Sequence, residues 1–292
     1  MKDLTSGRGM RLCEHDGVLE EVTPAIQCST GPFWAWDLED AMDALVDAGF
    51  KEIELMVTRD PKTQEPDIPL RLAEERGLHI ASVHGPFLAI TKTVWGPDPL
   101  EKIGRGIEMC EALGASFLIV HPPYLWERAY TAWCHGDMAA TAADTGVTVA
   151  VETMYPKWIA GRQVRVHRWL EPAELVRNCS AVVLDTSHVT VARQDPIAAF
   201  DVLLPKLVHV HLSNNAGDGR DGHLELEQGI LPMDRILERI KRTGYAGAIS
   251  LELNVSTYLE RPKELAEMLG RNRRYVEQRL SRRKPAKGLP RS

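Results

Sequence analysis

The chain has 292 residues, of which 44% are hydrophobic, and a net charge of −6, so it can bury one large core in a single domain. The acidic balance disfavours a broad nucleic-acid surface but leaves a local basic patch open. No apolar stretch approaches the roughly 20 residues that span a bilayer, and the N-terminus lacks the apolar core of a secretory signal. We therefore expect a cytoplasmic protein with no membrane partner.

Short apolar strands alternate with amphipathic helices between two polar ends. Residues 1–21 are expected to form a flexible N-terminal tail and 282–292 a basic C-terminal tail, with one domain over 22–281. The spacing of about 30 residues between strands is that of a strand, a helix and two loops. The predicted strands cover 25–29, 52–57, a segment ending at 84, 117–121, 147–152, 182–185, 207–211 and 248–253.

Proline and aspartate mark the starts of the predicted helices, and glycine marks their ends. Asp37 precedes the first helix, and Pro262 opens the last. Glycines at 49, 77, 114, 146 and 244 follow helices, and prolines at 99, 172, 196 and 232 begin them. Strict alternation implies parallel strands with helical crossovers. We predict α/β class, a single (β/α)8 TIM barrel; a doubly wound open sheet, which usually has fewer strands, is the alternative.

Side chains of the metal-binding type recur at the ends of these strands. In chain order they are His84, His121, Glu152, Asp185, His188, His211, Asp221, His223 and Glu252. In a closed barrel the carboxyl ends of all strands surround one axis, so these residues are predicted to share one site at that face. His209 lies two residues before His211 and faces the same way, so we interpret it as a structural residue of the barrel interior.

The chemistry of this set suits divalent ions. Its core combines three carboxylates with one imidazole, as Mn²⁺, Mg²⁺, Co²⁺ or Zn²⁺ prefer: Glu152, Asp185, His211 and Glu252. The surplus imidazoles favour zinc-like ions. The five cysteines are widely spaced without a C-x-x-C pair, which argues against a cysteine zinc site and a disulfide framework. We expect one to three ions per chain.

Several short segments together resemble one known superfamily. The segments VHGP, VHPP, AVET, LDTSHV, VHVHLSNN, DGHLELEQG and SLELN, within residues 25–280, resemble the xylose isomerase-like TIM-barrel superfamily. That superfamily includes sugar phosphate isomerases and epimerases, and also the endonuclease IV type of AP endonuclease (family 2). The resemblance implies a metal-dependent enzyme of one of these two kinds.

The two branches imply different ligand schemes. In the isomerase and epimerase branch, the core of four residues would hold a single metal. In the endonuclease branch the first metal would be held by His84, His121 and Glu152, the second by the core of four, and the third by His188, Asp221 and His223. All nine positions are present, but the segment SNNAGDGRDGH after His211 departs from the endonuclease branch, and no DNA-penetrating loop is recognisable.

Aromatic and basic side chains are expected around the site. All seven tryptophans follow strands, and indole faces stack on sugars and on bases. The segment 157–168 is strongly basic and could clamp a phosphate or carboxylate, although a solvated loop or an interface is the plainer alternative. The candidate substrate contacts are Trp34, Trp95, Trp126, Lys157 and Arg162.

We rank a metal-dependent isomerase or epimerase of a small sugar, sugar phosphate or polyol first. In it Glu152 and Glu252 exchange a proton on carbon through an enediolate, and His188 orients substrate hydroxyls. A trinuclear phosphoesterase acting on abasic DNA is second, so nucleic acid is disfavoured as a partner but not excluded. A non-catalytic barrel subunit is third. The sequence leaves a homo-oligomer open.

Overall fold

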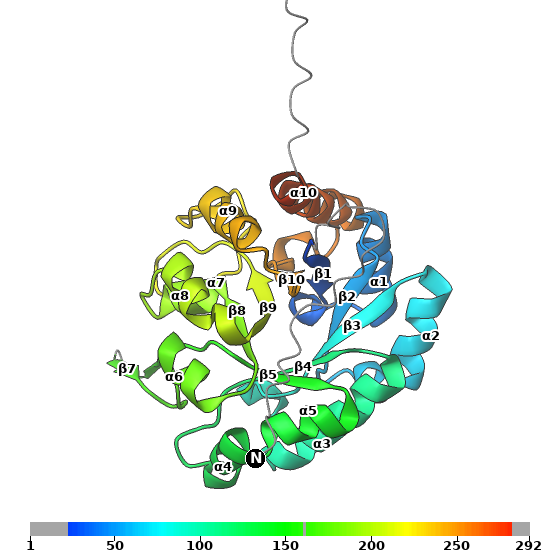
Figure 1. Ribbon diagram of the computed structural model, residues 1–292. Helices are drawn as coiled ribbons and strands as arrows, with labels where there is room; N and C mark the ends of the chain where they lie inside the picture. Colours follow the sequence, from blue (N-terminus) through cyan, green and yellow to red (C-terminus); the bar gives the residue numbers. More distant parts are fainter. Residues whose placement is uncertain (1–22, 160–161, 282–292) are drawn as a thin grey trace, which may run out of the picture.

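A closed barrel of parallel strands forms the centre of the molecule (Figure 1). The computed structural model describes residues 23–159 and 162–281. In these residues the strand order around the barrel is β1-β10-β9-β8-β5-β4-β3-β2, and β1 pairs with both β2 and β10. The strands are β1 (Ala25–Ser29), β2 (Glu52–Met56), β3 (His79–His84), β4 (Phe117–Val120), β5 (Thr148–Glu152), β8 (Val182–Asp185), β9 (Leu207–Leu212) and β10 (Ala248–Leu251). The single barrel is confirmed, and the closed pairing rules out the open sheet.

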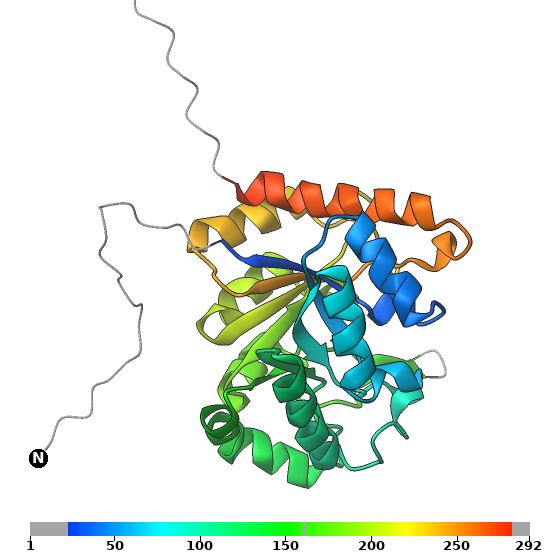
Figure 2. The same cartoon turned by 90° about the vertical axis from the view of Figure 1, so that its right-hand side faces the viewer.

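Helices cover the outside of the barrel (Figures 1 and 2). They are α1 (Leu38–Asp47), α2 (Asp67–Arg76), α3 (Pro99–Leu113), α4 (Arg128–Gly136), α5 (Met138–Thr145), α6 (Pro172–Asn178), α7 (Thr186–Val191), α8 (Pro196–Leu203), α9 (Met233–Thr243) and α10 (Pro262–Leu280). Helix α10 packs against both α1 and α9. The last helix therefore lies beside the first and completes the outer ring.

Local capping chemistry explains where the helices begin and end. The side chain of Asp98 accepts a hydrogen bond from the backbone N–H of Leu100 at the start of α3, and Asp195 caps α8 in the same way. Gly77 and Gly244 follow α2 and α9 with φ of 63° and 65°, a left-handed conformation that glycine adopts without strain. The predicted helix limits at these positions are confirmed.

The core lies between the barrel and the helices and continues inside the barrel. Phe50, Tyr130 and Phe200 are among the largest side chains that are almost fully buried. Burying an aliphatic or aromatic side chain of this size contributes about 1.5–3 kcal/mol relative to exposure. The barrel interior also holds polar side chains, among them Glu54 and His209, both completely buried. Because of these buried polar side chains, the barrel interior is not an ordinary apolar core.

The segment after β5 differs from the expected basic loop. It forms an antiparallel hairpin of β6 (Lys157–Ile159) and β7 (Arg162–Val164), seen at the left of Figure 1. Each strand has only three residues, which is too short to give a strand signal in the sequence. The backbone that follows pairs with the β4–α4 loop through a bridge between Tyr124 and His167.

Helix α7 is a second element that was not expected. Its sequence TSHVTV is rich in β-branched residues, which are poor helix formers. The carboxylate of Asp185 accepts a hydrogen bond from the backbone N–H of His188 at 2.8 Å, which starts the helix directly at the end of β8. This short helix fixes His188 beside the strand ends.

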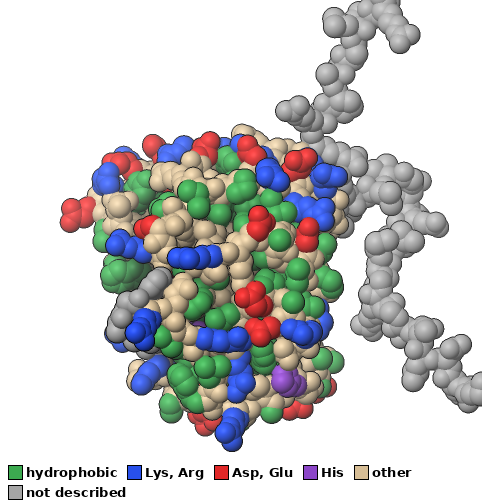
Figure 3. Space-filling model, turned by 90° about the vertical axis from the view of Figure 1, so that its left-hand side faces the viewer, with side chains coloured by type: hydrophobic (Ala, Val, Ile, Leu, Met, Phe, Trp, Pro, Cys, Tyr) green, Lys and Arg blue, Asp and Glu red, His purple; other side chains and the backbone are tan. Residues whose placement is uncertain are grey.

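The outer surface carries no single dominant charge on the face shown in Figure 3, where acidic and basic side chains both appear among apolar ones. No helix among the described residues is long and apolar enough to cross a membrane. The two predicted tails, 1–21 and 282–292, lie outside the residues that the structure describes.

Candidate metal centre

The structure brings all nine strand-end side chains to the carboxyl ends of the barrel strands. His84, Glu152, Asp185 and His211 lie at the ends of β3, β5, β8 and β9, His121 and Glu252 directly follow β4 and β10, His188 lies in α7, and Asp221 and His223 lie in the β9–α9 loop. Three sets within the nine place ligand atoms within 4.8 Å of one another: His84, His121 and Glu152; Glu152, Asp185, His211 and Glu252; Asp185, His188 and His223.

The first set joins two imidazoles to one carboxylate. His84 Nε2 lies 3.5 Å from Glu152 Oε2, and His121 Nε2 lies 3.3 Å from the same oxygen. The two rings are nearly perpendicular, with centroids 5.3 Å apart. All three side chains are buried.

The second set is arranged around one ring nitrogen. His211 Nδ1 lies 2.7 Å from Glu152 Oε1, 3.2 Å from Glu252 Oε2 and 3.8 Å from Asp185 Oδ2. Ligand atoms that share one ion at about 2.0–2.2 Å lie about 3.0–3.6 Å from one another. The four side chains therefore have close to the spacing that a shared divalent ion requires.

Beside the third set lies a carboxylate from a long loop, Asp221, which was the expected ligand where the structure groups Asp185 with the two histidines. Each oxygen of Asp221 faces one imidazole, with His188 Nε2 and His223 Nε2 both at 3.1 Å. Burial opposes protonation of His223, but the Asp221 carboxylate raises its pKa to about 10. Tyr155 and Ser187 each donate a hydroxyl hydrogen bond to Asp221, at 3.2 and 2.7 Å. These two donors hold the carboxylate in place and were not found from the sequence.

Unsatisfied buried oxygens test whether the set fits a cation. Glu152 Oε2 and Asp185 Oδ2 are buried and, within the described part of the chain, have no hydrogen-bond partner. A buried carboxylate oxygen without a partner carries a substantial desolvation cost. An ion in the first set would relieve that cost at Glu152 Oε2, and one in the second set would relieve it at Asp185 Oδ2. Carboxylate with imidazole is a donor set that divalent ions prefer. The residues therefore fit a metal.

Charges within the cluster shift its proton equilibria strongly. Burial opposes ionisation of Glu152, but positive charge on His188 and His211 holds its pKa well below the usual value. Burial also disfavours a charged His211, yet the surrounding carboxylates, Glu152 among them, raise its pKa well above the usual value. Burial lowers the pKa of His121 to about 3, and burial raises the pKa of Glu252. Without a metal, protons take the place of the cation at some imidazoles.

A cavity of about 420 Å³ opens above the cluster. Glu152 and Glu252 line it, together with His188 and the exposed indole of Trp34, and the lining among the described residues includes no lysine or arginine. Asp185 is completely buried and does not reach the cavity. A substrate in this cavity would therefore meet the two glutamates rather than the aspartate.

The other expected substrate contacts do not line this cavity. Trp95 is buried, and its indole N–H donates to the carbonyl of Gln64 at 3.0 Å, so the loop turns it towards the helix layer. Trp126 stacks on Tyr124 and borders a smaller cavity of about 250 Å³. Arg162 is exposed on β7. Trp95 and Trp126, expected with Trp34 in the pocket wall, thus lie away from this cavity, as does Arg162, and a role of these residues in substrate binding stays a prediction.

Lys157 has an intermediate position. Its Nζ lies 4.3 Å from the centroid of the Tyr155 ring, whose hydroxyl binds Asp221. Burial lowers the pKa of Lys157. The lysine is therefore connected to the third set through one aromatic ring but does not line the cavity.

Glu54 is the main side chain that the sequence interpretation missed. It lies in the middle of β2, completely buried, with Oε2 3.0 Å from His211 Nε2. A charged residue between Ile53 and Leu55 in an apolar strand was the available signal. The prediction considered only residues at strand ends, and Glu54 lies two residues before the end of β2.

Together the fold and the cluster define a class of protein: a (β/α)8 barrel that gathers histidine and carboxylate side chains at the carboxyl ends of its strands. The chain belongs to the xylose isomerase-like TIM barrel family, whose model matches residues 42–275. An uncharacterized protein of Mycobacterium tuberculosis is 30% identical over 269 residues, which cover 84% of this chain and 96% of that protein.

Solved structures share the fold at lower identity. A D-tagatose 3-epimerase-like protein has a TM-score of 0.62 and 21% identity, over 88% of this chain and 100% of that chain. An AP endonuclease of family 2 from Brucella melitensis has a TM-score of 0.64 and 16% identity, over 82% of this chain and 99% of that chain. Both enzyme types anticipated from the sequence therefore occur among proteins of this fold.

Proposed function

We propose that this protein is a divalent-metal-dependent isomerase or epimerase of a small sugar or polyol. The observation that carries the proposal is that Glu152 and Glu252 both line the cavity and both lie close to His211 Nδ1, at 2.7 and 3.2 Å. The cavity volume of about 420 Å³ falls within the range of small-molecule sites. Two carboxylates facing one substrate can remove a proton from carbon and return one.

The chain's own residues supply the proton transfer. One of the two glutamates takes the proton from the carbon next to the substrate carbonyl, which gives an enediolate. The other returns a proton to the opposite face of that carbon, or to the neighbouring carbon. An ion held by the core of four residues would polarise the carbonyl and stabilise the negative charge that develops on oxygen.

In this scheme His188 acts through Asp221 rather than on the substrate directly. Its Nδ1 lies 2.8 Å from the carbonyl of Thr153 and its Nε2 lies 3.1 Å from Asp221 Oδ2. Both ring nitrogens are thus engaged, so His188 orients Asp221, and the Asp221 carboxylate, which lines the cavity, accepts from a substrate hydroxyl.

The cavity lining favours an unphosphorylated substrate. Phosphate groups are usually held by arginine, lysine or helix N-termini. The described lining residues include neither cation, whereas Trp34 offers an indole face of the kind on which sugar rings stack. A free sugar or polyol is therefore favoured over a sugar phosphate.

Deuterium exchange tests this function. The metal-loaded protein is incubated in D₂O with a panel of ketoses, and deuterium on the substrate carbons is measured by mass spectrometry. Glu152→Gln and Glu252→Gln are expected to slow exchange on the order of 10²–10⁴-fold, while Glu111→Gln, an exposed change on α3, has no effect. The metal content of each variant is measured alongside, because loss of the ion would also stop exchange. Full exchange by both glutamate variants would refute the proton-transfer scheme.

A specific observation keeps phosphodiester hydrolysis as a second candidate. Asp221 lies between His188 and His223, the three residues that would hold a third ion in the endonuclease scheme, and a mononuclear isomerase does not need this contact. Clustered cations stabilise the attacking and leaving oxygens of a displacement together. The test is nicking of a duplex with one abasic site, with Zn²⁺ or Mn²⁺ present. Three bound ions and nicking would favour this candidate; one ion and no nicking would remove it.

A further inference from the structure

Glu54 is a carboxylate in the dry interior of the barrel, below the cavity. Its side chain is completely buried in the middle of β2, where it pairs in register with Ser29 of β1 and Ser82 of β3. Transferring a carboxylate from water to such a place costs several kcal/mol unless partners compensate for it. A residue of this kind therefore needs a structural or functional reason.

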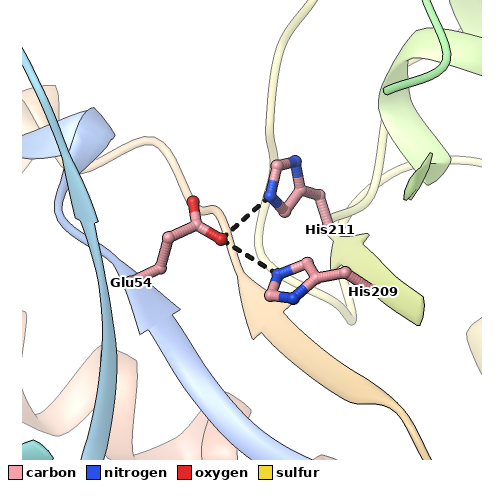
Figure 4. A group of neighbouring side chains, drawn as sticks. All are labelled: Glu54, His209 and His211. Carbon is pink, nitrogen blue, oxygen red and sulfur yellow. Dashed lines mark hydrogen bonds and ion pairs between the residues drawn. The ribbon is translucent and has the colours of Figure 1, made fainter. Parts of the chain in front are cut away.

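Its partners come from the other side of the barrel interior (Figure 4). Glu54 Oε2 lies 3.0 Å from His211 Nε2 and 2.9 Å from His209 Nε2. Both histidines belong to β9 and point the same way because they are two residues apart. Two imidazoles on one strand thus meet a single carboxylate oxygen from β2.

The opposite edge of the His211 ring faces the core of the metal centre. Its Nδ1 lies 2.7 Å from Glu152 Oε1 and 3.2 Å from Glu252 Oε2. A neutral imidazole carries one proton, so only one of its nitrogens can offer a lone pair to an ion. A carboxylate that faces a ring nitrogen accepts its N–H unless it binds an ion instead. With an ion in the core of four, Glu152 and Glu252 face the ion, and Glu54 is left to accept the N–H.

We propose that Glu54 is a positioning residue for the metal centre: it keeps the ring proton of His211 on Nε2, so that the Nδ1 lone pair points at the ion. Among the described residues, Glu54 does not line the cavity, and its oxygen is grouped with ring nitrogens of His209 and His211 rather than with the other members of the core of four, so it acts through His211. Because this role presupposes an ion in the core of four, it rests on the proposed function. Partners that orient ligating histidines typically change metal affinity about 10–100-fold.

His209 supports the same arrangement from below. It is completely buried, and its Nε2 shares Oε2 of Glu54 with His211. The carboxylate oxygen therefore lies between the two rings, in a hydrogen bond with His211 Nε2 and in close contact with His209 Nε2. His209 was expected to have a structural role in the barrel interior. We infer a more specific role, in which it positions Glu54, and Glu54 in turn orients the metal ligand His211.

The first experiment uses the unaltered chain. The protein labelled with ¹⁵N is stripped with a chelator and reloaded with Zn²⁺, and the ring nitrogens of its histidines are recorded by long-range ¹H–¹⁵N correlation. His211, assigned by comparison with His211→Gln, is expected to carry its proton on Nε2 and to show the metal-induced shift on Nδ1. Coordination through Nε2, or a proton on Nδ1, would overturn the proposal without requiring any Glu54 variant to fold.

The second experiment measures affinity. Glu54→Gln keeps the shape of the side chain and removes its charge. Zn²⁺ affinity, from competition with a chromophoric chelator, should fall about 10–100-fold with the number of ions unchanged. The matched control is Ser82→Ala, which removes the buried 2.7 Å hydrogen bond from β3 to Gln27 of β1 but touches no ligand. It should lower the melting temperature and leave Zn²⁺ affinity unchanged.

The outcomes separate this role from the proposed function. If the unaltered chain binds no ion, the proposed function fails and this role fails with it. If it binds ions and Glu54→Gln binds them equally well, only the role of Glu54 fails. Equal losses of affinity in Glu54→Gln and Ser82→Ala would show a general effect of interior damage, and loss of one whole equivalent in Glu54→Gln would show that Glu54 is itself a ligand; either result overturns the proposal.

Discussion

Glu152 belongs to two of the three ligand sets, so its replacement should affect two sites at once. Its Oε1 lies 2.7 Å from His211 Nδ1, while its Oε2 lies 3.3 Å from His121 Nε2 and 3.5 Å from His84 Nε2. Glu152→Gln keeps the shape and removes the charge that both sets use. We expect the ions of both sets to bind more weakly in this variant.

The size of the effect follows from the burial of Glu152. The side chain is 1% exposed, so solvent screens its charge very little. Breaking a buried charge pair by removing one partner costs about 3–5 kcal/mol, which is roughly two to three and a half orders of magnitude in a dissociation constant. The neighbouring variants should be selective: His84→Asn weakens the first set alone, and Glu252→Gln weakens the second alone.

The assay is titration of the chelator-stripped protein with Zn²⁺ in an isothermal calorimeter, with ion content checked by elemental analysis. Glu111→Gln, exposed on α3, provides the charge-matched control and should bind like the unaltered chain. The reasoning would be refuted if Glu152→Gln bound the same number of ions with dissociation constants within a factor of about ten, since that falls short of the lower bound derived from burial.

Three further outcomes follow from the geometry. Burial opposes a charge on His211, but nearby carboxylates raise its pKa well above the usual value, so at pH 7 the ring carries protons on both nitrogens and Zn²⁺ must displace the one on Nδ1. Binding heats should therefore differ between buffers of different ionisation enthalpy, and identical heats would contradict this. Trp34→Ala, at a 73% exposed position, should raise KM for a sugar about 2- to 10-fold and leave the melting temperature unchanged. Gly229 has φ of 107°, and a Cβ added there would lie only 2.5 Å from a backbone oxygen, so Gly229→Ala should displace the loop that carries Asp221 and His223 and lower the number of bound ions. Gly77→Ala is the control: φ is 63° and nothing lies within 4 Å of the new Cβ, so the number of bound ions should not change.

The fold was accessible from the sequence because its signals are local. Apolar strands, helix-opening prolines such as Pro99 and terminal glycines such as Gly77 act within a few residues, and each was predicted at its observed place. The exceptions, the hairpin after β5 and helix α7, are short and have weak propensities. Asp185 explains why α7 forms: it is the last residue of β8, and its side chain caps the helix that follows.

The candidate site could be predicted from the sequence only in part. Strand ends of a parallel barrel must meet at one face, which was enough to group residues as far apart as His84 and Glu252. The direction in which individual loop side chains point could not be predicted. Trp95 follows a strand as Trp34 does, yet its indole is buried against Gln64. Loop conformation depends on packing against neighbouring elements, which residue spacing does not encode.

The sequence by itself determined the barrel, the strand ends and the kinds of atoms that those ends offer to an ion. Only the tertiary structure decided that Glu152 is shared between two sets and that Glu54 of β2 reaches His211 of β9. Those contacts depend on the closure of the sheet, which brings together side chains of strands that are not neighbours in the barrel. Periodicity along a strand tells which side chains point inward, but not which of them meet.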